Sequence, residues 1–258
     1  MFKRILVFAY GVACYAIFFA TFLYALGFVG NFVVPRTIDG APEMPFMPAL
    51  GVNLVLLGAF ALQHSIMARP FFKSWLTQFI PESAERSTYV LFSSVALIAL
   101  FYWWQPLGGV VWSVESALAQ AVLYGAFFTG WLLVLVSTFL INHFDLFGLR
   151  QVWLQLVGKP YTHLKFGTPG PYKMVRHPLY LGWLFAFWAT PTMTFTHLVF
   201  AIMTTAYILL AIRFEERDLI ATLGDDYRRY RERVPIIIPG LGGSRRPAGV
   251  LERSKKVA

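Results

Sequence analysis

Five apolar stretches constrain this chain of 258 residues more than any other feature. A helix that crosses the hydrocarbon core of a membrane needs roughly 20 apolar residues. Four stretches come close to that length or exceed it, and we predict one transmembrane helix in each: Ile5–Val34, Ala49–Ala68, Tyr89–Trp104 and Leu118–Ile141. Charged residues make up only 14% of the chain, whereas soluble domains carry about 25%. The composition therefore indicates an integral membrane protein.

The fifth stretch, Leu179–Ile212, is too long for one span. Its 34 residues would form a straight helix of about 51 Å, against a hydrocarbon layer of about 30 Å. The segment from Pro191 to His197 interrupts it, and proline breaks the interior of a helix. We therefore predict a hairpin of two helices, Tyr180–Thr190 and His197–Ile212; the sequence leaves open whether the first crosses fully or re-enters. The fold class that follows is an all-α integral membrane protein with four transmembrane helices plus this C-terminal hairpin, five to six membrane helices in all.

The basic residues are distributed unevenly around these stretches. If the N-terminus is cytoplasmic, alternate segments place 21 of the 22 Lys and Arg on the cytoplasmic side. Short cytoplasmic loops are rich in Lys and Arg, so we predict that both termini are cytoplasmic. The net charge of +9 then reflects topology, with anionic lipid headgroups as its counter-charge. The sequence gives no reason to expect nucleic-acid binding.

The N-terminal stretch could be a cleavable signal peptide or a retained transmembrane span. Lys3 and Arg4 precede it, as basic residues precede the apolar core of a cleavable signal peptide. The stretch is much longer than the roughly 7–15 residues of such a core, so we predict a retained span. The single cysteine, Cys14, lies inside that span and has no partner for an internal disulfide.

We divide the chain into three parts. Residues 1–141 form the four-helix membrane part, residues 142–240 the cytoplasmic loop, the hairpin and a C-terminal helical part, and residues 241–258 a disordered basic tail. The loop is too apolar for disorder, and we expect an interfacial helix near Leu149–Val157. After Arg213 the helical spacing continues and breaks around Gly224-Asp225.

The first candidate cluster stands where the loop meets the hairpin, in the sequence "GPYKMVRHPLYLGW" from Gly170 to Trp183. Arginine can clamp a carboxylate through two bonds, and histidine changes its charge near neutral pH. Gly182 leaves room for a ligand or a second helix. Taken alone, Arg176 and His177 read equally well as a charged helix end that reaches towards the lipid headgroups.

The second candidate cluster, "RFEERDL", follows the hairpin and begins at Arg213. Because a hairpin returns to the side on which it started, Glu215 and Glu216 should lie near Arg176 and His177. Three of the four residues from Glu215 to Asp218 are acidic, and acidic residues at a cytoplasmic boundary do not contribute to the positive-inside charge pattern. A solvated cluster of salt bridges would explain them, as would a carboxylate that binds a ribose diol or an ammonium group.

Together the two clusters resemble the catalytic half of the isoprenylcysteine carboxyl methyltransferase and phospholipid methyltransferase group of membrane enzymes. The resemblance covers about residues 167–235 and rests on Arg-His-Pro-x-Tyr-x-Gly and Glu-Glu-Arg joined by a hairpin. It implies S-adenosylmethionine as the cofactor, beneath the cytoplasmic loop and C-terminal helix. The residues that the resemblance places against the cofactor are Tyr172, Arg176, His177, Tyr180 and Gly182, with Glu215 or Glu216 on the ribose or amino group.

The N-terminal half is similar to another set of sequences. "LQHSIMARPFFKSWLTQFIPESAERSTYVLFSS" and "HFDLFGLRQVW" resemble the bacterial methanethiol S-methyltransferases, which are close to the NnrU-like membrane proteins. This resemblance implies methylation of methanethiol to dimethyl sulfide in a bacterial inner membrane. Two alternatives stay open: a related methyltransferase of isoprenylcysteine or phospholipid, and a non-enzymatic NnrU-like protein of nitrogen-oxide or haem metabolism.

Further polar residues are predicted at the same membrane surface as the two clusters. These are His64 with Ser65, Arg86, His143 and Asp145, and ionisable groups at this depth are functional candidates. We predict His64 or His177 as the base or orienting group for a thiol, with Asp145 and Arg86 as supports and His143 beside them. His197 falls at the opposite turn and is set aside.

The histidines do not suggest a metal centre. His64, His143, His163 and His177 have no compact spacing, and cysteine ligands are lacking, whereas zinc and haem sites draw on such patterns. We therefore expect no metal.

Overall fold

The computed structural model describes residues 1–162, 164 and 166–240. The long helices of this part are α1 (Phe2–Gly30), α2 (Phe46–Met67), α4 (Glu85–Trp103), α5 (Ala117–Ile141) and α9 (Phe195–Leu223). The shorter helices are α3 (Pro70–Leu76), α6 (His143–Leu146), α7 (Leu149–Leu156), α8 (Pro178–Trp188) and α10 (Asp225–Arg233), with 3₁₀ turns η1 (Glu82–Ala84) and η2 (Gly170–Lys173). Two strands, β1 (Val110–Ser113) and β2 (Thr192–Thr194), complete the fold.

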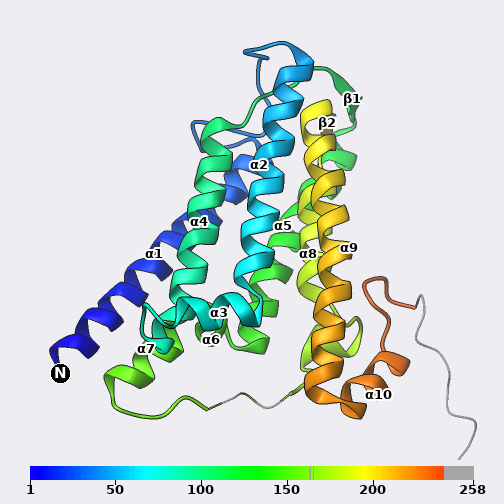
Figure 1. The fold of residues 1–258 in the computed structure, drawn as a ribbon. Helices are drawn as coiled ribbons and strands as arrows, with labels where there is room; N and C mark the ends of the chain where they lie inside the picture. Colours follow the sequence, from blue (N-terminus) through cyan, green and yellow to red (C-terminus); the bar gives the residue numbers. More distant parts are fainter. Residues whose placement is uncertain (163, 165, 241–258) are drawn as a thin grey trace, which may run out of the picture.

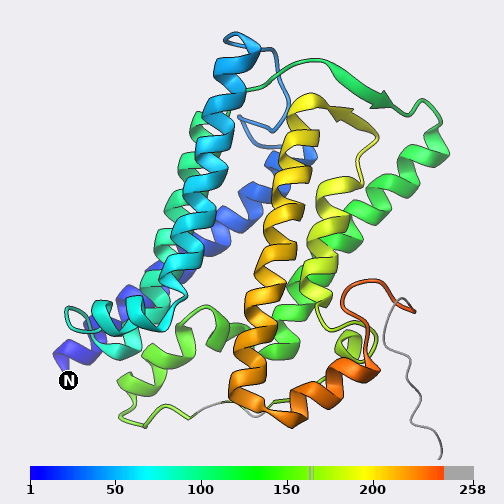
Figure 2. The same cartoon turned by 45° about the vertical axis from the view of Figure 1, so that its right-hand side comes forward.

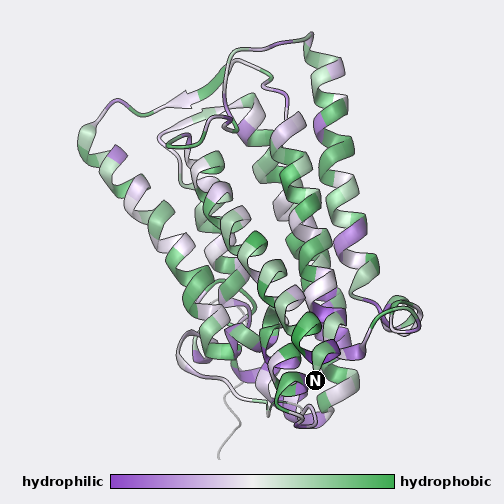
Figure 3. Ribbon diagram, turned by 90° about the vertical axis from the view of Figure 1, so that its left-hand side faces the viewer, coloured by the Kyte–Doolittle hydropathy of each residue, from purple (hydrophilic) through white to green (hydrophobic). Residues whose placement is uncertain are grey.

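The predicted fold class is confirmed. Five helices are long and apolar enough to cross a membrane: α1, α2, α4 with its preceding turn, α5 and α9. They run side by side as a bundle (Figure 1), and apolar residues dominate their shafts while hydrophilic residues gather near the end that holds the N-terminus (Figure 3). The chain is a multi-pass membrane protein.

The C-terminal hairpin forms as predicted, with one difference in length. Helix α8 has 11 residues, which at 1.5 Å per residue gives about 16 Å, well short of a full span. Helix α9 continues past the predicted end at Ile212 to Leu223, because no proline or glycine intervenes before Gly224. Gly224 has a positive φ of 58° and separates α9 from α10. The predicted break around Gly224-Asp225 is thus confirmed.

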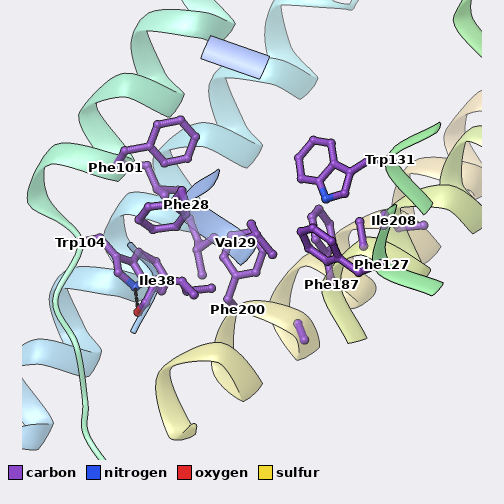
Figure 4. Close-up of a cluster of buried hydrophobic side chains, with 14 of the residues drawn as sticks. Phe28, Val29, Ile38, Phe101, Trp104, Phe127, Trp131, Phe187, Phe200 and Ile208 are labelled. Atoms are coloured by element: carbon purple, nitrogen blue, oxygen red, sulfur yellow. Dashed lines mark hydrogen bonds between the residues drawn. The ribbon is translucent and has the colours of Figure 1, made fainter. Parts of the chain in front are cut away.

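One apolar core ties the two halves of the bundle together. Phe28 of α1 and Phe101 of α4 meet ring to ring at 4.7 Å, and Phe187 of α8 meets Phe200 of α9 at 5.0 Å. Both pairs belong to a single buried cluster (Figure 4). Buried aromatic side chains of this size dominate the energetics of a core, so the hairpin is held against the N-terminal helices.

The two strands were not expected from the apolar pattern. They form an antiparallel pair, β1 with β2, at the end of the bundle opposite the N-terminus (Figure 2). Pro191 ends the helical part of the hairpin's first arm, and its carbonyl accepts from the backbone N–H of Val114 at 2.9 Å. The pairing supplies partners to backbone groups that a helix no longer satisfies.

Within the described residues, the segments predicted to be cytoplasmic lie at one end, which we call the basic end. The N-terminus, α3, α6, α7 and α10 lie there (Figures 1 and 2). Helix α7, Leu149–Leu156, matches the predicted interfacial helix. The division at residues 141 and 240 stays a prediction, and the predicted tail, 241–258, falls outside the described residues.

Candidate active site

The two candidate clusters meet at the basic end, as the hairpin geometry predicts. Pro178 starts α8, where its fixed φ suits the first helical turn. The two residues before it bond through their backbones to the chain that follows α10: the N–H of Arg176 donates to the carbonyl of Pro235 at 2.8 Å, and that of His177 to Ile236 at 3.1 Å. The loop and the C-terminal segment therefore hold each other in register.

Glu216 is the centre of a buried group that we call the clasp. Its carboxylate oxygen Oε1 accepts from Arg176 Nε at 2.7 Å, from His177 Nε2 at 3.3 Å and from the Tyr227 hydroxyl at 3.4 Å. Oε2 faces Arg231 Nε at 3.4 Å. The clasp consists of these five side chains: Arg176, His177, Glu216, Tyr227 and Arg231. A carboxylate with this many donors, only 8% exposed, has little capacity left for a ligand.

Arg176 also fastens the C-terminal segment. Its Nη1 donates to the carbonyl of Val234 at 2.6 Å and to that of Arg231 at 3.0 Å. The planar fork of the guanidinium suits several fixed acceptors at once. The structure therefore gives Arg176 a fastening role, and its predicted contact with a cofactor stays a prediction.

Glu215 differs from its neighbour in the clasp. Its side chain is 45% exposed, and its Oε2 lies 3.7 Å from His177 Nδ1. It also accepts a hydrogen bond from the Tyr180 phenol and lies within electrostatic range of the Tyr172 phenol. Of the two candidate acids, Glu215 is the one whose carboxylate remains open to a ligand.

Tyrosines surround this open carboxylate. The Tyr230 hydroxyl donates to the Tyr172 carbonyl at 2.6 Å. Burial, and then the charge of Glu215, raises the pKa of Tyr172. Burial likewise raises the pKa of Tyr230 to about 12, against the opposing charge of Arg176. Both phenols are therefore neutral near pH 7, and the Tyr230 proton is already donated to the Tyr172 carbonyl. A cavity of about 330 Å³ adjoins Tyr230 and is lined in part by Phe166 and Arg229.

Gly182 serves a close helix contact. A Cβ atom added there would lie 2.7 Å from the Gly130 carbonyl oxygen and 2.9 Å from Val134 N, both on α5. Only glycine permits this approach of α8 to α5. Of the two uses that the sequence left open for Gly182, the structure shows the second helix; its place in a cofactor pocket stays a prediction.

His64 lies at the basic end of α2 in a shell of hydroxyl and aromatic groups. Its Nδ1 is 3.2 Å from Ser93 Oγ, and its Nε2 is 2.8 Å from the Tyr89 hydroxyl. The ring stacks on Phe60 at 5.3 Å and lies 6.5 Å from the Tyr207 ring. We call these five residues the His64 shell. Tyr207 in turn bonds to Ser65 at 3.0 Å.

Tyr180 connects the His64 shell to the clasp. Its phenol is within electrostatic range of Glu215 on one side and of Tyr207 and Tyr89 on the other. The ring of Tyr180 also lies 5.5 Å from that of His177. Tyr180 therefore places the His64 shell in one neighbourhood with His177 and Glu215.

His143 is fully occupied by structural contacts. Its Nε2 bonds to the Tyr15 hydroxyl at 2.9 Å and its Nδ1 to Thr138 Oγ1 at 2.8 Å. The ring stacks on Phe139 at 4.2 Å and is 2% exposed. Burial lowers the pKa of His143, so it is neutral at pH 7. These contacts keep α5 and α6 in place.

Arg86 and Asp145 lie apart from the clasp, on a cavity of about 730 Å³ at the basic end. Asp145 pairs with Arg150 at 2.8 Å. Arg86 donates from Nε to the Leu146 carbonyl at 2.8 Å, and its guanidinium carbon lies 5.1 Å from the centre of the Tyr89 ring. Arg86 thus reaches the His64 shell, whereas Asp145 supports the loop.

Sequence reasoning missed several members of these groups. Tyr89 and Ser93 are one turn apart on the same face of α4, a spacing that could have marked them as partners of one side chain. Tyr227 and Arg231 have the same spacing on α10. In the described residues, no group of three or more His, Cys, Asp or Glu could hold a metal ion.

Known proteins resemble the chain over nearly its whole length. A methanethiol S-methyltransferase of Crocosphaera subtropica is 54% identical, over 93% of this chain and 94% of the relative. One of Mycobacterium tuberculosis is 55% identical, over 92% of this chain and 97% of the relative. Nurim of Xenopus laevis is 31% identical over 67% of this chain and 63% of its own length. No family model matches the chain, and no solved structure matches it.

Proposed function

The chain belongs to the methanethiol S-methyltransferase family, and we propose that it transfers a methyl group from S-adenosylmethionine to methanethiol, giving dimethyl sulfide. The observation that carries this proposal is the open carboxylate of Glu215 beside His177. It lies in one neighbourhood with the half-buried His64 through Tyr180. A methyl donor and a small thiol need two such adjoining sites.

The residues beside the clasp fit S-adenosylmethionine by their chemistry. The cofactor carries an ammonium group and a ribose diol, both donors for a free carboxylate, and its sulfonium supplies an activated methyl group. We assign Glu215 to the ammonium or the diol, and Tyr172 and Tyr180 to the polar and cationic parts, since phenol rings attract cations. His177 orients Glu215. Arg176, Glu216 and Gly182 hold the wall in place.

The chain's own residues must supply the thiolate. A thiol with a pKa of about 8.5 or higher is mostly protonated at pH 7, and the thiolate is the nucleophile. We assign His64 as the proton acceptor, with Arg86 supporting the negative charge that develops. His177 is the second candidate for this role. His143 and Asp145 act at a distance, because their polar atoms are engaged by Thr138 and Arg150.

Location suits the substrate. Methanethiol is small and apolar and partitions into lipid, so it can reach a site enclosed by membrane helices. We place the protein in a bacterial inner membrane with both termini and the basic end in the cytoplasm, where the positive-inside rule puts basic segments. The acidic residues Glu215 and Glu216 then face the compartment that holds the cofactor.

The test is a reconstituted assay. Purified protein is incubated with S-adenosylmethionine and methanethiol, and dimethyl sulfide is measured in the headspace, with S-adenosylhomocysteine measured in solution. An isoprenylcysteine analogue and an amine phospholipid are offered as competing acceptors. Dimethyl sulfide formation supports the proposal. Methylation of the lipid or the isoprenylcysteine instead, or no affinity for the cofactor, contradicts it.

A further inference from the structure

The two ring nitrogens of His64 already have partners. Ser93 Oγ, which also accepts from the Gln63 side-chain nitrogen at 3.4 Å, lies 3.2 Å from His64 Nδ1. The Tyr89 hydroxyl lies 2.8 Å from Nε2 and 3.1 Å from Nδ1, within hydrogen-bond distance of both. Neither nitrogen is therefore free to meet a thiol directly.

The faces of the His64 ring are covered as well. Phe60 stacks against it at 5.3 Å, and Tyr89 and Tyr207 lie at 5.1 and 6.5 Å between ring centres. The Tyr89 oxygen, by contrast, keeps a second lone pair when its proton is donated to the ring. A proton can approach His64 through that oxygen.

We propose that Tyr89 relays the thiol proton to His64, so that the Tyr89 oxygen is the group that faces the thiol. This inference rests on the proposed function. The S–H proton moves to Tyr89 Oη while the Tyr89 proton moves to the unprotonated ring nitrogen of His64, which leaves an imidazolium and a thiolate. The thiolate sulfur forms a bond to the methyl carbon, and the carbon–sulfonium bond breaks with its electron pair on the departing sulfur. The imidazolium then releases its proton to water, through Tyr89 in reverse.

The charges around Tyr89 favour this path. Arg86 places its guanidinium over the phenol ring at 5.1 Å, and a cation stabilises the negative charge that passes through the phenol oxygen. The other charged or titratable groups that face Tyr89 are Glu85 on α4, Arg69 after α2, Tyr207 on α9 and Tyr180 on α8. The two arginines outnumber the single acid, so the local field stabilises negative charge on the phenol oxygen and on the thiolate. The charge of Arg86 acts against the imidazolium, which must therefore be short-lived.

The relay is tested with Tyr89→Phe, which keeps the ring and removes the hydroxyl. The matched control is Tyr10→Phe, since Tyr10 is a membrane-helix phenol bonded to Thr88 at 2.9 Å, next to Tyr89 in the chain. For Tyr89→Phe we expect kcat at pH 7 to fall by about a hundredfold or more, the usual contribution of a positioned acid or base. Affinity for S-adenosylmethionine should stay unchanged, and Tyr10→Phe should keep near-normal turnover.

The pH profile separates a relay from a packing role. In Tyr89→Phe the solution must ionise the thiol, so kcat/KM should rise about tenfold per pH unit up to the thiol pKa. More acidic thiols should restore turnover in the variant more than in the unaltered protein. Ser93→Ala, which removes the hydroxyl beside Nδ1, should cause a smaller loss with the same trend.

Each outcome has a separate meaning. Near-normal turnover in Tyr89→Phe, or an equal loss at every pH and with every thiol, overturns the relay. If the unaltered protein forms no dimethyl sulfide, the proposed function itself fails. If the unaltered protein is active and the turnover of Tyr89→Phe is near normal, the relay alone is overturned.

Discussion

Both ends of the α8–α9 hairpin hold a buried histidine beside a carboxylate, and the two pairs differ in what they leave open. At the end opposite the N-terminus, His197 is 1% exposed, and its Nε2 contacts the Phe187 carbonyl at 2.9 Å. Its Nδ1 lies 3.9 Å from Asp39. Asp39 in turn accepts from Asn31 at 2.7 Å and from Thr194. This end closes on itself and fixes a turn.

The basic end also holds a histidine beside a carboxylate, and it has one further carboxylate. His177 and Glu216 close on Arg176 and Tyr227 much as His197 closes on Asp39, but Glu215 follows with an exposed carboxylate. The comparison shows that a histidine–acid pair in this bundle is not in itself a sign of a ligand site. What distinguishes the basic end is the Glu215 carboxylate, whose side chain is 45% exposed and keeps capacity for a ligand.

The largest expected effect comes from breaking the clasp. Arg176→Ala removes the main partner of Glu216 and two bonds to the C-terminal segment, and we expect a loss of about 3–5 kcal/mol in the free energy of unfolding. Thermal unfolding in detergent and trypsin cleavage after α10 measure it. The control is Arg231→Ala, whose side chain is 42% exposed and which should cost about 1 kcal/mol or less. Equal losses in the two variants would show that the clasp is not centred on Arg176.

A smaller effect, confined to binding, is expected for Glu215→Gln. Loss of a bond to a charged group costs about 1.5–3 kcal/mol, so the dissociation constant for S-adenosylmethionine should rise by about one to two orders of magnitude. Isothermal titration measures it, and the melting temperature should not change. Asp218→Asn is the control, since Asp218 lies on the same helix and pairs with Arg69. Unaltered affinity in Glu215→Gln would remove the distinction drawn between the two ends.

A substitution at the end opposite the N-terminus should change the stability of the protein and nothing else. Asp39→Asn weakens the bonds from Asn31 and Thr194 and removes the charge that faces His197 at 3.9 Å, and we expect a loss of about 1 kcal/mol in the free energy of unfolding. Cofactor affinity and turnover should stay as they are, which the titration and the headspace assay check. A variant that melts normally yet binds cofactor poorly would mean that the far end communicates with the site.

The smallest expected effect concerns His143, both of whose ring nitrogens are bonded. It tests whether such a histidine at the basic end has a structural role. Burial lowers the pKa of His143 from its usual 6.5, so the unfolded chain takes up the proton first. Stability is therefore complete above pH 6.5 and declines as the pH falls through the depressed value. Thermal unfolding between pH 5 and 8 should show this slope. His143→Gln, which keeps bonding groups without the titration, should flatten it; an unchanged slope would assign it to another group.

The sequence predicted those parts of the fold that depend on the length and interruption of apolar stretches. Apolar length located the spans, Pro191 located the hairpin turn, and the hairpin brought Glu216 to Arg176. It could not separate Glu215 from Glu216, because their difference arises from which side of α9 meets the C-terminal segment. The partners of His64 could not be predicted for the same reason. Tyr89 is 25 residues away, and the contact depends on how α2 and α4 are rotated about their axes.

The shortness of α8 bears on how the protein enters its membrane. Eleven apolar residues are too few to be retained in a bilayer as an independent segment. Helix α8 instead packs backbone to backbone on α5 through Gly182 and Gly130, and its continuation pairs with β1 just ahead of α5. Biogenesis therefore has an order: α5 must already be in place when α8 and α9 insert together. Ribosomes finish the C-terminal half of this protein only after they have built the surface that receives it.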